Sequence, residues 1–161
     1  MATPVPRSAA RILLVDEAAR VLLFHGCDPA DPADEYWITP GGGLEPGETP
    51  AEGAARELFE ETGLRVDPVV LGNPVWHNVV EFSFDAVRYR QEQAFFLHRV
   101  ASWAVDTTGF DEIEQASMDR HRWWTVDELA DTSEPVYPET LATLLRELVA
   151  TSDAGEPERL M

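Results

Sequence analysis

The sequence predicts a single domain over residues 1–161, of the α+β or layered α/β class, with flexible ends at 1–8 and 151–161. A chain of 161 residues suits one domain and can bury roughly two-thirds of its extended surface. Several segments rich in Val, Phe and Trp favour strands, because branched and aromatic side chains pack well on a pleated surface. Two or three segments with the helical spacing of apolar residues separate those strands.

The amino-terminal part is expected to form three short strands. Apolar runs at 10–15 and 21–24 predict two strands joined by a turn. A repeated Asp-Pro pair predicts a loop over 26–35. A third strand at 36–38 then leads into a Thr-Pro-Gly-Gly-Gly segment.

A helix over residues 50–62 has clear signals at both ends. Thr49 is a natural N-cap, Pro50 suits the first helical position, and Glu52 completes a capping box with Thr49. Gly63 is the expected residue just beyond the last turn, because glycine readily adopts the left-handed conformation that ends a helix.

The rest of the chain is predicted to be mostly strands, followed by two helices. Four segments rich in Val, Phe and Trp are expected to be strands: 65–71, 74–84, 86–89 and 94–105. The polar stretch 106–120 predicts a loop, and 121–125 a further strand. Thr125 is a plausible cap for a short helix at 126–129. A stripe of leucines predicts a final helix over 138–150.

The composition disfavours polyanionic partners. The formal net charge is −18, and none of the 12 basic residues is a lysine. Binding to a nucleic-acid duplex or to an anionic membrane surface needs clustered basic charge, so both partners are disfavoured. If the substrate is itself an anion, a bound metal ion is the simplest way to hold it.

Localisation signals point to the cytoplasm. The amino-terminal apolar run, 12–15, is too short for the core of a signal peptide or for a membrane span. The single cysteine, Cys27, cannot form an internal disulfide, and it is expected to be a small hydrophobic residue rather than a reactive thiol.

The predicted helix at 50–62 carries an unusual stripe of like charges. Glu57, Glu60 and Glu61 lie three and four residues apart, and each such pair costs about 0.2–0.5 kcal/mol. Two of them also lie in the last turn, where the helix dipole disfavours anions by about 0.3–1 kcal/mol each. A divalent cation would remove the conflict, and carboxylates suit Mg²⁺, Mn²⁺ or Ca²⁺. Helix geometry alone leaves a solvated acidic face equally open.

The same stretch resembles the Nudix box, G-x5-E-x7-R-E-U-x-E-E-x-G-U, in which U is aliphatic. Every fixed position is filled without a gap, by Gly42, Glu48, Arg56, Glu57, Leu58, Glu60, Glu61, Gly63 and Leu64. Nine specified positions over 42–64 make a highly specific match. The sequence is therefore similar to the Nudix hydrolases.

The resemblance implies a mixed β-sheet sandwiched between α-helices, and a loop–helix–loop that binds Mg²⁺ or Mn²⁺. It implies hydrolysis of a nucleoside diphosphate linked to another group, with a small-molecule nucleotide as substrate. The implied metal ligands are three carboxylates and a backbone carbonyl: Glu57, Glu60, Glu61 and Gly41. Glu48 and Arg56 would orient these carboxylates by pairing within the loop–helix–loop.

The general base that activates the attacking water is left open by the resemblance, because it differs between subfamilies. Within the box, Glu57 and Glu60 are the candidates, and Glu57 is favoured. Outside it, the stretch 106–120 offers Asp111, Glu112 and Glu114. Glu114 is the first choice there, and an ordinary solvated loop acid is the alternative.

The sequence gives fewer signals about substrate recognition. Arg88, Arg90 and Glu92 lie where two predicted strands connect, and scarce arginines there could hold phosphates. The alternative is charge balance at an exposed strand end. Signatures of the ADP-ribose, diadenosine polyphosphate, coenzyme A and NADH subfamilies are missing. By elimination a nucleoside triphosphate or small nucleotide derivative remains.

Two other classes compete with the hydrolase. One is a Nudix-like regulatory domain that binds nucleotides without chemistry, although such domains usually lose box carboxylates that are intact here. The other is an isomerase of isoprenoid diphosphates, whose extra catalytic cysteine does not fit the surroundings of Cys27. A homodimer is common in the family and is left open by these residues.

Overall fold

The computed structural model describes residues 3–148. Within them one eight-stranded sheet has the order β5-β6-β1-β2-β3-β8, with β4 added beside β1 and β7 beside β2. The strands are β1 (Val5–Val15), β2 (Val21–Asp28), β3 (Asp31–Ile38), β4 (Gly41–Gly43), β5 (Trp76–Phe84), β6 (Val87–Arg99), β7 (Met118–Trp124) and β8 (Val136–Tyr137). The β1–β6 and β3–β8 pairs are parallel and the others antiparallel, so the sheet is mixed.

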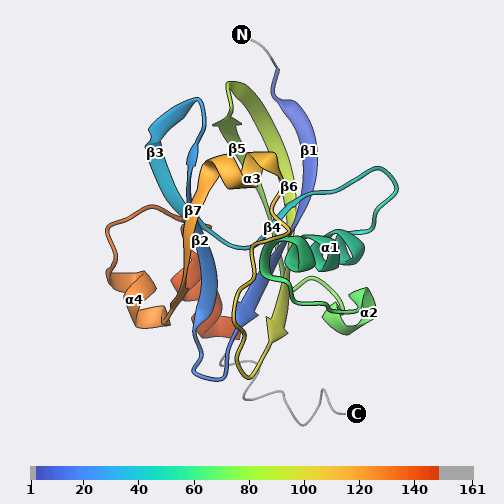
Figure 1. Cartoon of the computed structure of the whole chain (residues 1–161), viewed down its shortest axis with the longest axis vertical. Coiled ribbons are helices and arrows are strands. Elements are labelled where there is room, and N and C mark those ends of the chain that lie inside the picture. Colours follow the sequence, from blue (N-terminus) through green and yellow to red (C-terminus); the bar gives the residue numbers. More distant parts are fainter. Residues whose placement is uncertain (1–2, 149–161) are drawn as a thin grey trace.

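Helices lie on both faces of this sheet (Figure 1). They are α1 (Pro50–Thr62), α2 (Pro68–Leu71), α3 (Glu112–Ser117) and α4 (Val126–Asp131), and residues 141–148 are also helical. The predicted mixed sheet between helices is therefore confirmed. None of the helices within residues 3–148 has the length and apolarity needed to cross a bilayer.

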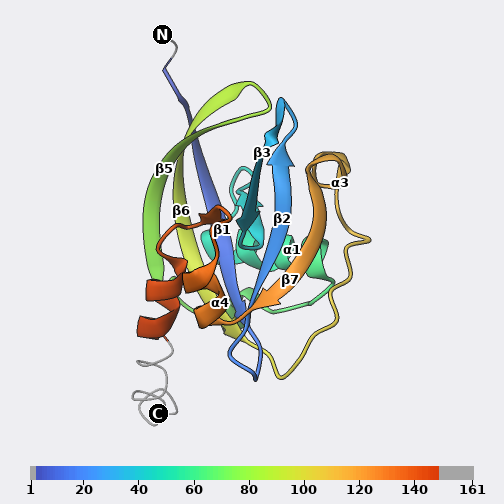
Figure 2. The same ribbon diagram turned by 90° about the vertical axis from the view of Figure 1, so that its left-hand side faces the viewer.

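The sheet divides into two groups of strands that diverge from a shared end. β1 and β2 are paired only where Val15 lies opposite Val21. Farther along β1, its neighbour on that side is β4, with Ala10 opposite Gly42. Figure 2 shows β5, β6 and β1 leaning away from β3, β2 and β7. β4 therefore lies where the two groups part.

Alternate residues of β1 pack into two separate apolar cores. Ile12 and Leu14 face α1, where Ala54 and Leu58 are fully buried. Leu13 and its neighbours face the opposite side and pack with residues of α4 and the 141–148 helix. This second core consists of Leu13, Val15, Val21, Leu23, Trp37, Phe95, Trp124, Leu129, Leu141, Leu144 and Leu145. Both faces of the sheet are thus covered, as its apolar runs require.

The amino-terminal elements are longer than the sequence predicts. β1 begins at Val5, so much of the stretch 1–8 is strand rather than a flexible end. The predicted loop at 26–35 is wrong, because β2 and β3 continue to a tight turn. Asp28 stabilises that turn, since its Oδ1 accepts from the backbone N–H of Ala30 at 2.9 Å. The same oxygen accepts from the backbone N–H of Asp85 at 2.8 Å and so links this turn to the one between β5 and β6.

Three later predictions also need correction. The stretch 65–71 contains α2 instead of a strand, because Asp67 caps a helical turn that begins at Pro68. β6 joins the predicted strands 86–89 and 94–105 into one strand, which begins at Val87 and ends at Arg99, short of the predicted 105. The predicted loop at 106–120 contains α3 and the start of β7. The predicted flexible tail, 151–161, lies outside the described residues.

Candidate metal centre

α1 is held in a fixed position by its ends and by its buried side. The Thr49 hydroxyl accepts from the Glu52 backbone N–H at 3.2 Å, and the Glu52 carboxylate accepts from the Thr49 N–H at 2.9 Å. Gly63 ends the helix at φ 78° and donates to the Phe59 carbonyl at 2.9 Å. Packing of Leu58 against β1 then turns Glu57 and Glu61 toward β4.

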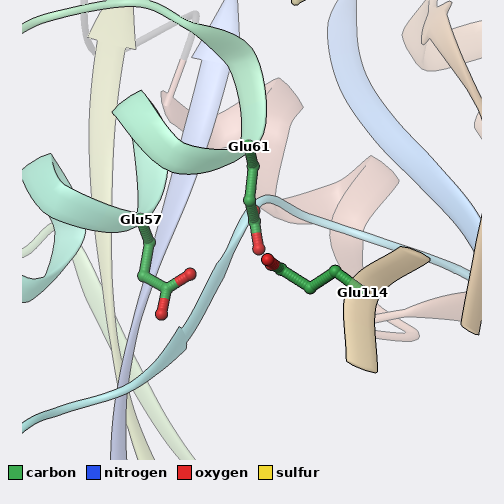
Figure 3. A group of neighbouring side chains, drawn as sticks. All are labelled: Glu57, Glu61 and Glu114. Carbon is green, nitrogen blue, oxygen red and sulfur yellow. The ribbon is translucent and has the colours of Figure 1, made fainter. Parts of the chain in front are cut away.

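Three glutamates from two helices converge beside β4. Glu57 and Glu61 of α1 and Glu114 of α3 each offer a carboxylate oxygen, and these atoms lie within 4.8 Å of one another. Figure 3 shows the Glu61 and Glu114 carboxylates facing each other, with Glu57 beside them. Gly41 donates its backbone N–H to Glu61 Oε1 at 2.8 Å. The other oxygen, Glu61 Oε2, is fully buried and has no partner within the described residues.

Within this carboxylate cluster, defined as Glu57, Glu61 and Glu114, burial dominates the electrostatics of Glu57 and Glu61. It raises the pKa of Glu61 well above the ordinary glutamate value, and contact with Glu114 and the charge of Glu57 act in the same direction. Burial also raises the pKa of Glu57, although the charge of Arg56 opposes that shift. Buried carboxylates that repel one another need a counter-charge. Hard oxygen donors around an unpartnered buried oxygen fit a divalent cation such as Mg²⁺ or Mn²⁺.

Arg56 links the carboxylates of the loop and the helix. Its Nε and Nη2 donate to the two oxygens of Glu48 at 2.7 and 2.9 Å. Its Nη1 donates to Glu57 Oε1 at 3.0 Å, and its Nη2 to the Gly43 carbonyl at 3.1 Å. The hydrogen bonds from Arg56 to Glu48 lower the pKa of Glu48. The structure thus brings Glu48 and Arg56 together beside the cluster.

Glu60 lies apart from the three converging carboxylates. Its Oε2 is 3.4 Å from Arg56 Nη1, and its side chain is 36% exposed. Glu60 was expected among the ligands from the box, whereas Glu114 takes the third place in the described cluster.

Glu114 reaches the cluster because α3 replaces the expected loop. The Asp111 carboxylate accepts from the Glu114 N–H at 2.8 Å, and Glu114 Oε1 accepts from the Asp111 N–H at 3.0 Å. This capping box, Asp-x-x-Glu, is the signal in the sequence that indicates a helix here. The neighbouring candidates Asp111 and Glu112 are exposed and lie outside the cluster.

The candidate substrate residues lie at the β5–β6 hairpin. Arg88 and Arg90 approach the two oxygens of Glu81 at 3.6 and 3.5 Å, and both are more than half exposed. Glu92 is also exposed. None of these three residues belongs to the carboxylate cluster. The arrangement matches the alternative of charge balance at a strand end. Sequence reasoning missed Arg11, which is buried where β1 enters its apolar half.

Comparison with known proteins places this geometry in a family. The family model described as NUDIX domain matches residues 5–147. An RNA pyrophosphohydrolase of Cereibacter sphaeroides is 31% identical over 149 residues, covering 85% of this chain and 89% of that protein. A protein with the same name from Mesorhizobium japonicum is 30% identical over 141 residues, covering 75% and 80%.

Solved structures share the fold at lower sequence identity. The MutT protein from Methanosarcina mazei Go1 superposes with a TM-score of 0.68 at 18% identity, covering 94% of this chain and 99% of that one. A bifunctional NMN adenylyltransferase/ADP ribose pyrophosphatase from Francisella tularensis, complexed with AMP and a Mn ion, gives 0.58 at 19% identity. It covers 91% of this chain and 43% of its own.

Proposed function

Since the chain belongs to the NUDIX domain family of pyrophosphohydrolases, we propose that it uses Mg²⁺ or Mn²⁺ to cleave a diphosphate linkage in a nucleoside triphosphate or a small nucleotide derivative. One observation carries the metal dependence. Glu57, Glu61 and Glu114 converge around a buried carboxylate oxygen that has no partner in the described part of the chain.

Some residues of the chain would bind the cation, and another would accept the proton of the attacking water. Glu57 and Glu61 would hold the cation together with the Gly41 carbonyl. Arg56 and Glu48 keep Glu57 in place, because the guanidinium bridges the loop and the helix. When bound, a divalent cation neutralises charge on the phosphate oxygens and lowers the pKa of a coordinated water.

Glu114 is our candidate for the general base. It comes from α3, across from the two α1 carboxylates, and one of its oxygens is occupied by the Asp111 N–H. Its carboxylate faces Glu61, where it would accept a proton from the attacking water. Glu57 is the second candidate, but Arg56 holds it in an ion pair at 3.0 Å. Glu60 would have to leave Arg56 before it could serve as a ligand.

The terminal triphosphate of an RNA is a second candidate substrate. It is favoured by similarity to proteins named RNA pyrophosphohydrolase over most of the chain. The net charge of −18 opposes binding along an RNA backbone. Arg88 and Arg90, which could have held additional phosphates, already face Glu81. We therefore place free nucleotides first.

The test is product analysis with purified protein, Mg²⁺ or Mn²⁺, and a panel of substrates. The panel contains natural and oxidised nucleoside triphosphates, dinucleoside polyphosphates, ADP-ribose, nucleotide sugars and a short 5′-triphosphorylated RNA. Glu61→Gln should lose at least about a hundredfold in rate. Glu112→Gln, an exposed acid on the same helix as Glu114, is the matched control and should retain wild-type activity.

Two results would count against the proposal. Cleavage that survives Glu61→Gln would place the chemistry elsewhere or in a contaminant. Nucleotide binding without cleavage of any panel member would favour a catalytically silent nucleotide-binding regulatory domain.

A further inference from the structure

β4 consists of three glycines, Gly41–Gly43, and lies between a side that carries carboxylates and a side that carries arginines. A Cβ on Gly42 would lie 2.7 Å from Glu57 Oε1, on the carboxylate side. A Cβ on Gly41 would lie 3.0 Å from Arg11 Cδ, and one on Gly43 would lie 2.7 Å from Arg7 Nε. The carboxylate cluster and these two arginines therefore approach opposite faces of one thin strand.

Arg11 is a buried cation. Burial lowers the pKa of its guanidinium, and the charges of Glu61 and Glu57 oppose that shift without touching the guanidinium. Arg11 is 9% exposed, its Nη1 donates to the Thr39 carbonyl at 3.0 Å, and its Nε donates to Gln93 Oε1 at 3.3 Å. Within residues 3–148 no carboxylate forms an ion pair with it, and its Nη2 donates no hydrogen bond. Some fully buried polar atoms in that part of the chain have no hydrogen-bond partner. Nη2 of Arg11 is not one of them, so part of its surface is open to solvent. Burying such a charge is costly unless something pairs with it.

Neutral polar groups extend this environment along β6 and β5. Gln91 Nε2 donates to Gln93 Oε1 at 2.7 Å, and Gln93 Nε2 donates to Asn78 Oδ1 at 2.8 Å. Gln91 is 1% exposed, yet its Oε1 has no partner within the described residues. Arg7 lies over the Tyr89 ring, 5.4 Å from its centroid. A mostly buried row of hydrogen-bonded polar side chains, with the Arg11 cation at one end, is thus built into an acidic protein.

We propose that Arg11 is a substrate-binding residue, which donates through its Nη2 edge to a phosphate oxygen of the bound nucleotide on the face of β4 opposite the carboxylate cluster. The proposal rests on the proposed function for the identity of the ligand. A phosphate is the class that fits, because Arg7 and Arg11 are both cations and the surrounding amides are neutral. With Nε and Nη1 engaged by Gln93 and Thr39, Nη2 is the nitrogen that can donate a charge-assisted hydrogen bond to a phosphate oxygen.

β4 is thin enough for one substrate to contact groups on both of its faces. Among the described strands β4 pairs only with β1, and side chains bind its backbone elsewhere: the Gly41 N–H donates to Glu61, and Arg56 donates to the Gly43 carbonyl. In the proposed complex one phosphate lies beside Glu57 and Glu61 and the other beside Arg11. Gly41 connects the two places, because its N–H binds Glu61 while it lies opposite Arg11 in the β1–β4 pairing.

The test removes the metal so that only the arginine side can hold phosphate. Binding of the four common nucleoside 5′-monophosphates and of the matching nucleosides is measured by calorimetry in EDTA. At least one monophosphate should bind about tenfold or more tightly than its nucleoside, as a charge-assisted hydrogen bond permits. Arg11→Met should bring that ratio close to one, and Arg11→Lys should recover only part of it. Arg99→Met, at the exposed end of β6, is the matched control.

A measurement on the unaltered protein covers the case in which Arg11→Met does not fold. The Nε–H resonance of Arg11 is followed by NMR during the same titrations in EDTA. A shift that saturates with the monophosphate, and that the nucleoside does not produce, supports the proposal. An unmoved resonance, a wild-type ratio near one, or a ratio that survives Arg11→Met overturns it.

Failure here is distinguishable from failure of the proposed function. Glu61→Gln should abolish hydrolysis and leave the monophosphate-to-nucleoside ratio in EDTA unchanged. Arg11→Met should abolish the ratio and leave Mn²⁺ affinity within a few-fold of wild type. Loss of Mn²⁺ binding in Arg11→Met as large as that in Glu61→Gln would show that Arg11 only braces the Thr39–Gly41 corner, and would also overturn the substrate-binding role.

Discussion

α1 and α3 each deliver carboxylates to one centre, but they are fixed in different ways. α1 has 13 residues, a capping box at its start, a left-handed glycine at its end and a side packed into the core. α3 has six residues, and of these only Ser117 is buried. Glu57 and Glu61 are therefore held by a rigid element, whereas Glu114 depends on a short helix with little packing of its own.

The difference suggests a division of labour. Metal ligands must keep their spacing, because a divalent cation binds well only to donors already in place. A proton acceptor must approach and leave the attacking water during each turnover, so a lightly packed helix suits it. The predictions below test whether α1 and α3 are separable in this way, beginning with the largest expected effect.

Glu61→Gln and Glu114→Gln should differ in what they remove. Glu61→Gln should lose tight Mn²⁺ binding and activity together, because the buried ligand becomes neutral. Glu114→Gln should reduce kcat by about 10²–10⁴, the usual contribution of a general base, while Mn²⁺ affinity changes only a few-fold. Calorimetric or EPR titration with Mn²⁺ and steady-state kinetics measure the two effects. Equal losses of Mn²⁺ affinity in both variants would contradict the division.

Arg56→Met should disturb the α1 side of the centre without unfolding the helix. It removes the hydrogen bonds to Glu48, Glu57 and the Gly43 carbonyl at once. Mn²⁺ affinity is expected to fall by about 10–100-fold, as is typical when groups that orient ligands are lost. Far-UV circular dichroism should remain unchanged, because the caps of α1 are intact. Unaltered Mn²⁺ affinity would mean that Arg56 does not position Glu57.

The same contrast explains which parts could be predicted from the sequence. The bounds of α1 followed from Thr49, Pro50 and Gly63, whose effects act within a few residues. The position of Glu114 in the cluster depends on α3 meeting α1, a contact between segments about fifty residues apart in the printed sequence. Local propensity carries no information about such a meeting, so Glu114 could be chosen only by resemblance.

Two features that are not predicted correctly from the sequence also depend on contacts beyond local propensity. The valines of 65–71 predict a strand, yet Asp67 followed by Pro68 starts a helical turn. Arg11 was overlooked because it interrupts an apolar run, and its burial depends on Thr39 and Gln93, which are distant in sequence. Composition predicts the kind of surface a strand needs, but partners across the sheet decide which polar residue is buried there.

The stability of the metal-free protein should fall as pH rises above the ordinary glutamate range. Burial raises the pKa of Glu61 and of Glu57, so the folded state keeps protons that the unfolded chain has released above about pH 4.3. The free energy of unfolding then decreases by about 1.4 kcal/mol per pH unit for each retained proton, until the pH passes the raised pKa values. Urea unfolding in EDTA between pH 5 and 8 measures this slope.

Glu61→Gln isolates the contribution of the cluster from that of the other acids. Glu48 and Asp119 have lowered pKa values, and they stabilise the fold as pH rises through the acid range. They are present in both proteins, so they cancel in the difference between wild type and variant. Glu61→Gln should show a shallower decline, and Mg²⁺ should flatten the wild-type slope. A decline of the same steepness in the variant would locate the responsible groups outside the cluster.

The smallest effects should come from removing the two helix caps. Loss of the α1 cap should lower stability more than kcat, and loss of the α3 cap should lower kcat more than stability. Thr49→Ala removes a cap of the packed helix and should lower the free energy of unfolding by about 1 kcal/mol, with kcat almost unchanged. Asp111→Ala removes the cap of an exposed six-residue helix, so global stability should change by less than about 0.5 kcal/mol. It also removes the hydrogen bond that restrains the Glu114 amide, and kcat should fall several-fold because the base is less often in position. Urea unfolding and kinetics on the same preparations measure both. If Asp111→Ala lowers stability as much as Thr49→Ala and leaves kcat intact, α3 is as firmly packed as α1 and the proposed division of labour is wrong.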